Sequence, residues 1–166
     1  MKLRKLEIKD APFMLEWMHD KSVLEDLRTN FLSKTMEDCV NFINKSKNDD
    51  TNWNVAIVDE QDIYMGTVSL KNIKMDSAEF GITIRSCAMG KGYALWAMNE
   101  AIRVGFEEMN IYSVYWCVSP DNHRAVRFYD KNGFERVEAS KLTMIDESYT
   151  AEQIQYYIWY QVKKGK

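Results

Sequence analysis

The chain has 166 residues, of which 46% are apolar and 28% are charged, and its formal net charge is -3. This length suits one domain with its own core, and the apolar and aromatic content excludes an intrinsically disordered chain. The weakly acidic charge lacks the basic footprint of a nucleic-acid-binding protein. We therefore expect one globular domain spanning residues 1–166, with no nucleic-acid partner.

Cysteine spacing and hydropathy together predict the compartment. Cys39, Cys87 and Cys117 are widely spaced and form no CxxC pair, which is typical of reduced thiols. The first residues lack the apolar segment of a secretory signal. No stretch approaches the roughly 18 apolar residues that a membrane span needs. We expect a cytoplasmic protein without a membrane partner.

The N-terminal residues predict a strand followed by helices. Apolar and polar residues mix over residues 3–8 as in a strand. Asp10 is a suitable N-cap for a helix whose apolar residues recur at helical spacing up to Met18. Residues 23–31 predict a short helix and a loop, and a capping-box pattern over residues 35–38 begins the next helix.

Three strands are expected next. Residues 53–58, 64–70 and 78–84 are short alternating or apolar runs bounded by turn residues. Gln61-Asp62 fits a tight turn between the first two runs. The pattern favours antiparallel hairpins.

The C-terminal half changes to an alternation of helices and strands. Residues 90–109 predict a long amphipathic helix, and residues 113–118 a strand buried on both faces. Residues 122–132 predict a second helix, which ends at a glycine. Two final strands are expected at residues 134–139 and 155–162, so the chain reads as a mixed α/β domain.

A glycine-rich turn precedes the long helix. A helix N-terminus carries unpaired N–H groups and a partial positive charge. Glycines let a phosphate approach these donors, and Lys91 adds a charge, so residues 89–94 predict a pyrophosphate cradle. A plain tight turn would use the same glycines. Leu95 stands where a dinucleotide-binding GxGxxG motif needs its third glycine, and no P-loop motif is present.

Three segments in this order resemble the GCN5-related N-acetyltransferase (GNAT) superfamily. They are Ala78-Glu79-Phe80-Gly81-Ile82, Gly90-Lys91-Gly92-Tyr93-Ala94 with its helix, and residues 118–134. The third is the most specific, because it matches the family pattern N-x-x-A-x-x-x-Y-x-x-x-G-F. Cys87 departs from the Gln or Arg that usually begins the turn. The closest branch contains ribosomal-protein, spermidine and amino-sugar acetyltransferases.

The resemblance implies an acyl-CoA N-acyltransferase fold of the α/β class. This fold has a mixed, mostly antiparallel sheet of about seven strands, about four helices, and splayed fourth and fifth strands. It also implies acetyl-CoA as co-substrate, with the pantetheine arm between those two strands. The implied cofactor-binding residues are Ile82, Thr83, Ile84, Met89, Gly90, Lys91, Gly92, Tyr93, Ala94, Asn122 and Tyr129.

The resemblance and the chemistry of amine acetylation point to two catalytic residues. A free alkylamine has a pKa of roughly 10, so it must lose a proton before it attacks. Glu79 is the candidate base or water-orienting group. Tyr129, at the family's tyrosine position, is the candidate proton donor to the departing thiolate. Without these roles, Glu79 would be a solvated strand residue and Tyr129 a core aromatic residue.

Relatives build the acceptor pocket at the end of the first helix. The candidate substrate-binding residues are Trp17, Asp20, Glu25, Asp26 and Glu79. Acidic groups there would attract a cationic amine, although a solvated helix end has the same composition. His19 and His123 lie far apart without a surrounding ligand pattern, so we expect no metal.

The resemblance implies an N-acetyltransferase that acts on a primary amine. We expect a small-molecule acceptor, such as a polyamine or an amino sugar, and direct attack in a ternary complex. A peptide N-terminal acetyltransferase and a non-catalytic CoA-binding module are the alternatives. The aromatic-rich segment 156–160 could support a homodimer.

Overall fold

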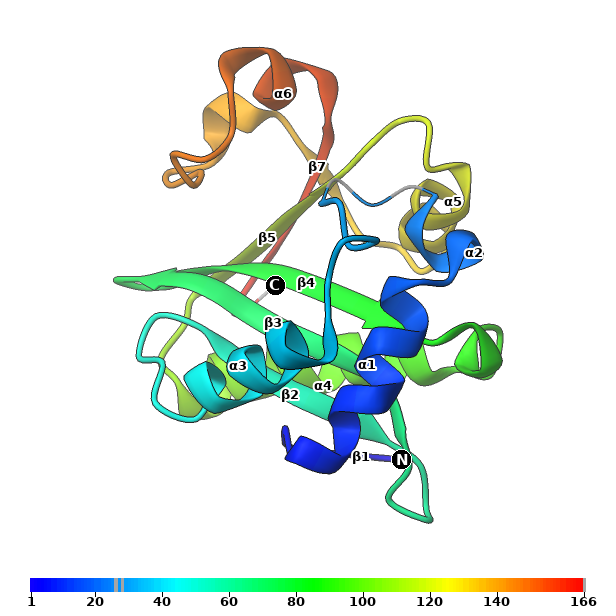
Figure 1. The fold of residues 1–166 in the computed structure, drawn as a ribbon. Helices are drawn as coiled ribbons and strands as arrows, with labels where there is room; N and C mark the ends of the chain where they lie inside the picture. Colours follow the sequence, from blue (N-terminus) through cyan, green and yellow to red (C-terminus); the bar gives the residue numbers. More distant parts are fainter. Residues whose placement is uncertain (26, 28, 166) are drawn as a thin grey trace.

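The computed structural model describes residues 1–25, 27 and 29–165. In this part of the chain seven strands form one sheet (Figure 1). The strands are β1 (Lys2–Lys5), β2 (Trp53–Val58), β3 (Tyr64–Lys74), β4 (Ser77–Ile84), β5 (Ser113–Val118), β6 (Arg136–Val137) and β7 (Ile158–Lys163). The α-helices are α1 (Ala11–Met18), α2 (Lys21–Leu24), α3 (Met36–Ser46), α4 (Tyr93–Glu108), α5 (His123–Lys131) and α6 (Ala151–Tyr156).

The strand order is β1-β2-β3-β4-β5-β7-β6, and β4 and β5 form the parallel pair. The other neighbours are antiparallel. This topology confirms the predicted mixed, mostly antiparallel sheet of seven strands. No helix in the described residues is long and apolar enough to span a membrane.

Helices cover both faces of the sheet. Along β2, Val55 and Ile57 join the core beneath α4, whereas Ala56 and Val58 join the core beneath α1 and α3. Successive side chains of a strand point to opposite faces, so one strand serves both cores. We call the side that α4 and α5 cover the α4 face, and the side that α1 and α3 cover the α1 face.

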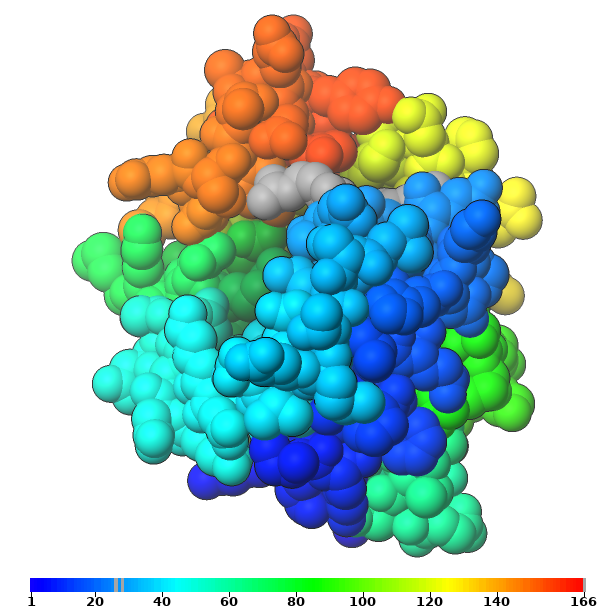
Figure 2. Space-filling view, in the orientation of Figure 1, coloured from blue at the N-terminus to red at the C-terminus, as the bar shows by residue number. Residues whose placement is uncertain are grey.

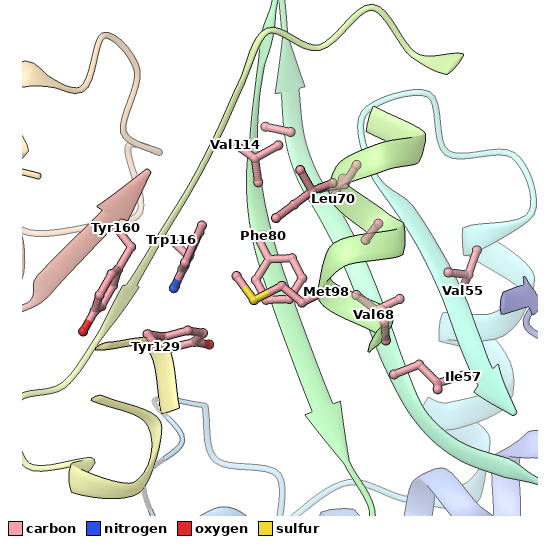
Figure 3. Close-up of a cluster of buried hydrophobic side chains, with 14 of the residues drawn as sticks. Val55, Ile57, Val68, Leu70, Phe80, Met98, Val114, Trp116, Tyr129 and Tyr160 are labelled. Atoms are coloured by element: carbon pink, nitrogen blue, oxygen red, sulfur yellow. The ribbon is translucent and has the colours of Figure 1, made fainter. Parts of the chain in front are cut away.

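The larger core lies on the α4 face (Figure 3). Trp116 of β5 stacks on Tyr160 of β7 and packs edge-on against Phe80 of β4. Gly105 of α4 lies against Leu70 of β3, where an added Cβ would come within 3.0 Å of Leu70 Cδ1. The glycine therefore lets the long helix sit close to the middle of the sheet.

The β4 and β5 strands separate after a short contact. Residues 77–79 pair in register with residues 113–115, and the pairing ends there. β4 nevertheless continues along β3 to Ile84, and β5 continues along β7 to Val118. The facing edges of β4 and β5 therefore diverge, which confirms the predicted splay of the fourth and fifth strands.

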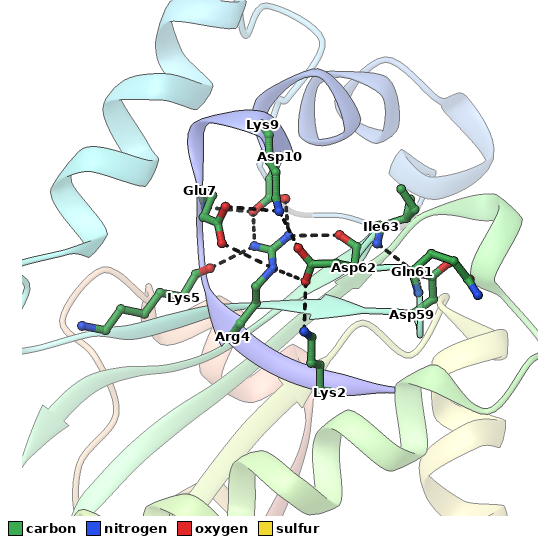
Figure 4. A network of polar contacts seen from close by, with 10 residues as sticks. All are labelled: Lys2, Arg4, Lys5, Glu7, Lys9, Asp10, Asp59, Gln61, Asp62 and Ile63. Carbon is green, nitrogen blue, oxygen red and sulfur yellow. Dashed lines mark hydrogen bonds and ion pairs between the residues drawn. The ribbon is translucent and has the colours of Figure 1, made fainter.

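A polar network fixes the N-terminal strand to the sheet (Figure 4). The Arg4 guanidinium binds both carboxylate oxygens of Asp10 at 2.7 and 2.8 Å, and its Nε lies 2.8 Å from Asp62. Asp10 is 1% exposed. Hydrogen bonds from Lys9 and Arg4 lower the pKa of Asp62 far below its usual value. The network joins β1, the start of α1 and the turn between β2 and β3.

The structure corrects some predicted boundaries. The strand expected over residues 134–139 is reduced to β6, which a 3-10 turn follows at Ala139–Lys141. The strand expected from residue 155 begins only at 158, because residues 151–156 form α6. Thr150 and Gln153 make a reciprocal capping box there, a helix signal that the sequence prediction missed.

The N-terminal prediction also needs correction. The first strand ends at residue 5 instead of 8, since residues 8–10 form a 3-10 turn. Six α-helices occur in the described residues instead of about four: α2 begins just before the segment where a short helix was expected, and α6 was not predicted. In the aromatic segment proposed for a homodimer, Trp159 and Tyr160 are buried, whereas Tyr156 is exposed. Homodimerisation stays a prediction.

Candidate active site

The turn before α4 has the geometry of an anion cradle. Gly90 and Gly92 adopt φ values of 72° and 85°, which side chains other than glycine rarely adopt. A Cβ added at either glycine would meet no atom within 4 Å, so the space in front of the turn is open. In the described residues, the N–H groups from Gly90 to Ala94 have no protein acceptor. These amides and the helix dipole fit a pyrophosphate.

Partly buried contacts hold the start of this turn in place. Arg85, directly after β4, donates to both carboxylate oxygens of Glu16 at 3.0 and 2.9 Å and to the carbonyl of Tyr64 at 2.9 Å. Its guanidinium also lies 4.5 Å from the ring centre of Phe13. Cys87, where the sequence departs from the family, is exposed, so its side chain leaves the backbone cradle undisturbed.

Two cations lie beside the cradle. Lys91 is exposed within the turn. Arg124, in the first turn of α5, places Nη1 3.5 Å from the Sδ atom of Met89. The sequence prediction did not include Arg124. In the sequence, Arg124 is only a basic residue two positions after Asn122. Many helices carry such a residue without a functional role.

The β4 residues beyond the splay expose a backbone edge. Ile82 and Ile84 direct their side chains into the α4-face core, and Thr83 is half-buried. Any contact of the two isoleucines with a ligand in the splay would therefore use their backbone groups. This agrees with the role that the family resemblance implies for them, and the role itself stays a prediction.

Tyr129 of α5 lies on the α4 face of the splay. It is 8% exposed, and its ring packs against Trp116 and Tyr160 at centroid distances of 5.3 and 5.1 Å. Figure 3 shows its hydroxyl end directed toward β4. Burial raises the pKa of Tyr129 well above its usual value, so the phenol keeps its proton at neutral pH. Asn122 accepts from the N–H of Ala125 at 2.9 Å and so caps α5.

Glu79 lies at the last paired position of β4, where the splay begins. Its side chain is 6% exposed and points to the α1 face, opposite to Phe80. Tyr149 donates its hydroxyl to Oε1 at 2.7 Å, and Lys71 Nζ lies 3.4 Å from the same oxygen. Asn72 Nδ2 donates to Oε2 at 3.1 Å. The sequence prediction included none of these three partners.

The remaining acceptor candidates do not gather at Glu79 in the described part of the chain. Trp17 is 4% exposed, and its indole N–H donates to the Tyr64 hydroxyl at 3.1 Å within the α1-face core. Asp20 caps α2, and the hydrogen bond from the Ser22 hydroxyl lowers the pKa of Asp20. Glu25 is exposed at the end of α2. Asp26 lies outside the described residues.

The histidines take no part in a common site. His19 places Nε2 3.0 Å from the carbonyl of Lys34, and His123 is exposed at the start of α5. The described residues contain no group of three or more His, Cys, Asp or Glu side chains that could hold a metal ion.

Comparisons with known proteins identify relatives by sequence. Residues 1–135 match the acetyltransferase (GNAT) domain family. The chain is 28% identical over 135 residues to the N-acetyltransferase YnaD of Bacillus subtilis, a match that covers 81% of this chain and 78% of that protein. It is 33% identical over 93 residues to the spermidine N(1)-acetyltransferase of Vibrio cholerae, covering 55% and 54%.

A solved structure extends the likeness to nearly the whole chain. The spermidine N-acetyltransferase of Vibrio cholerae, crystallised with CoA and spermine, superposes with a TM-score of 0.79 at 24% identity. The match covers 99% of this chain and 96% of the other, and it confirms the predicted fold. Family, fold and the open cradle at α4 agree. The chain belongs to the GNAT acetyltransferase family and is an acetyl-CoA-dependent N-acetyltransferase.

Proposed function

We propose that this enzyme acetylates the primary amine of a small molecule, by direct attack of the amine on acetyl-CoA within a ternary complex. The observation that carries the proposal is the arrangement around the splay of β4 and β5. The anion cradle lies at the start of α4, Tyr129 lies on the α4 face, and Glu79 lies on the α1 face.

The cradle sets the direction of the co-substrate. The amides of residues 90–94 would bind the pyrophosphate, with Lys91 and Arg124 as flanking cations. The pantetheine arm would then run along the free edge of β4 beside Ile82 and Ile84 toward Glu79. A backbone N–H near Gly81 or Ile82 would polarise the thioester carbonyl.

The two faces of the sheet divide the proton transfers between them. On the α1 face, Glu79 would take a proton from the acceptor ammonium, directly or through water, which frees the nitrogen lone pair to attack the carbonyl carbon. When the tetrahedral intermediate breaks its C–S bond, Tyr129 on the α4 face would protonate the leaving thiolate. The raised pKa of Tyr129 keeps the phenol protonated until that step.

The burial of Glu79 supports a small acceptor over a peptide. Its carboxylate is nearly enclosed where β4 and β5 separate. An amine that reaches it must therefore be carried by a slender part of the acceptor molecule. Figure 2 shows the surface hollowed between the orange C-terminal segment and the cyan N-terminal region, with the green strands at its floor. Relatives named as spermidine acetyltransferases also support a small amine.

The test is thiol release from acetyl-CoA with a panel of spermidine, amino sugars and peptides with free N-termini. We expect turnover with at least one small amine and little with the peptides. Turnover with peptides alone would replace the proposal by a peptide N-terminal acetyltransferase. Calorimetric binding of acetyl-CoA without any turnover would contradict the proposed chemistry. The variant Tyr129→Phe serves as the catalytically impaired control.

A further inference from the structure

Three side chains from two separate parts of the chain converge on the Glu79 carboxylate. Lys71 and Asn72 come from β3, and Tyr149 comes from the segment before α6. A carboxylate offers about four acceptor positions, and these donors use three of them among the residues that the structure describes. Within that part of the chain, about one position is left to accept a hydrogen bond from a ligand.

The path of β3 is distorted at this point. Side chains alternate along a regular strand, so neighbours such as Lys71 and Asn72 should point to opposite faces of the sheet. Asn72 instead has a φ of 50°, and the pairing of β3 with β4 is irregular between Lys71 and Lys74. Asn52 Oδ1 accepts from the N–H of Asn72 at 3.0 Å and supports this conformation. The irregularity brings both side chains to one carboxylate.

Gly81 makes room for the lysine. A Cβ added at Gly81 would lie 3.1 Å from Cε and 3.4 Å from Nζ of Lys71. The Lys71 side chain therefore lies across the backbone of β4 directly beyond Glu79. The two donors from β3 thus contact the carboxylate from the side of β4 that faces β3.

Tyr149 approaches the carboxylate from the side of β4 that faces β5. Its ring packs against Trp159 at 5.3 Å and Tyr157 at 6.3 Å, which fixes the direction of its hydroxyl. The hydroxyl donates to Glu79 of β4 and also lies 3.4 Å from Sγ of Cys117 of β5. Tyr149 therefore bridges the two strands just where they part, on the α1 face.

We propose that Tyr149 is a positioning residue for catalysis, which orients the Glu79 carboxylate with its remaining acceptor position directed at the incoming amine. The inference rests on the proposed function, since it concerns the group that receives that amine. It makes the segment before α6 part of the acceptor side of the active site. Burial raises the pKa of Tyr149, so the phenol remains a donor at neutral pH.

The experiment compares Tyr149→Phe with Tyr157→Phe, since both substitutions remove one phenolic hydroxyl and the two rings are in contact on either side of α6. NMR of protein labelled with ¹³C at the glutamate carboxyls gives the Glu79 resonance, assigned by its loss in Glu79→Gln. We expect this resonance to move in Tyr149→Phe and to stay in place in Tyr157→Phe. With the best amine of the panel, kcat of Tyr149→Phe should fall about tenfold, the effect of one hydrogen bond to a charged group. The KM for acetyl-CoA should stay within twofold.

The outcomes separate the two proposals. An unmoved Glu79 resonance in Tyr149→Phe would overturn the positioning role, whatever the acceptor is. Equal losses of kcat and of melting temperature in both variants would overturn it too, because they would show a purely structural effect. If the wild-type protein acetylates no amine, the proposed function fails, and the NMR comparison still decides the role of Tyr149.

Discussion

The cofactor cradle and the Glu79 cluster are built in different ways. The cradle is one continuous stretch, Gly90 to Ala94, which acts through backbone amides. The Glu79 cluster takes side chains from β3, β4 and the segment before α6. A continuous backbone site leaves a motif in the sequence. A site assembled from distant side chains can change its partners while the fold and the cofactor site stay the same.

The largest expected effect separates chemistry from cofactor binding. Tyr129→Phe should lower kcat by about a hundredfold to a thousandfold, the usual contribution of a positioned acid. Its affinity for acetyl-CoA should stay within twofold, because the cradle lies on another element. Steady-state kinetics and calorimetry measure the two quantities. Tyr160→Phe, which removes a hydroxyl of the same aromatic cluster bonded to Asp130, is the control. Equal turnover in the two variants would remove Tyr129 from the mechanism.

A second prediction concerns a region that serves neither site. Arg4→Met leaves the buried Asp10 carboxylate without its bidentate partner, so the free energy of unfolding should fall by about 3 kcal/mol. Urea denaturation measures this loss. The folded variant should retain wild-type kcat and acetyl-CoA affinity, because Arg4 lies on the edge strand β1, and β2 and β3 separate it from β4. A change of kcat in folded protein would show that the network also shapes the active site.

The cradle can be tested with a matched pair of glycines. Gly92→Val places a β-branched residue at a positive φ and in the space where the pyrophosphate would lie, so Kd for acetyl-CoA should rise about tenfold. Gly133→Val imposes a similar strain, at φ 77° with open space around it, beyond the end of α5. Similar Kd values for both variants would show that strain alone, and not the cradle, determines the affinity.

The smallest effect concerns the flanking cation. Arg124→Met should raise Kd for acetyl-CoA about threefold at low salt, since exposed charge pairs contribute under about 1 kcal/mol. The difference from wild type should shrink as ionic strength rises, because salt screens exposed charges. Titration calorimetry at two salt concentrations measures both effects. A difference that is independent of salt would contradict an electrostatic role for Arg124.

The sequence predicted the parts of the molecule whose signals are local. The strands at residues 53–58 and 113–118 match the structure, and Asn122 caps its helix as the motif implied. The glycine turn was recognisable because positive φ values restrict the residue type. In each case neighbouring residues contain the information.

The sequence did not predict the contacts made across the fold. Tyr149 is 70 residues away from Glu79, and no periodicity or motif links the two. The Asn72 side chain turns toward Glu79 because Asn52, which lies before β2, holds its backbone and because β3 pairs irregularly with β4. The prediction of a plain hairpin includes neither feature. Trp17 was predicted to line the acceptor pocket. It lies in the core instead, where its indole N–H donates to the Tyr64 hydroxyl. Such contacts depend on topology, which short patterns do not encode.

The brief contact between β4 and β5 divides the sheet into two wings. One wing contains β1 to β4, and the other contains β5, β7 and β6. Three residue pairs between β4 and β5 connect the two wings. The amides of a pantetheine arm lodged between β4 and β5 would hydrogen-bond to backbone groups that these strands leave unpaired, and would so link the two wings. Binding of acetyl-CoA should therefore stiffen the whole domain, and the melting temperature of the protein should rise as acetyl-CoA saturates the site between β4 and β5.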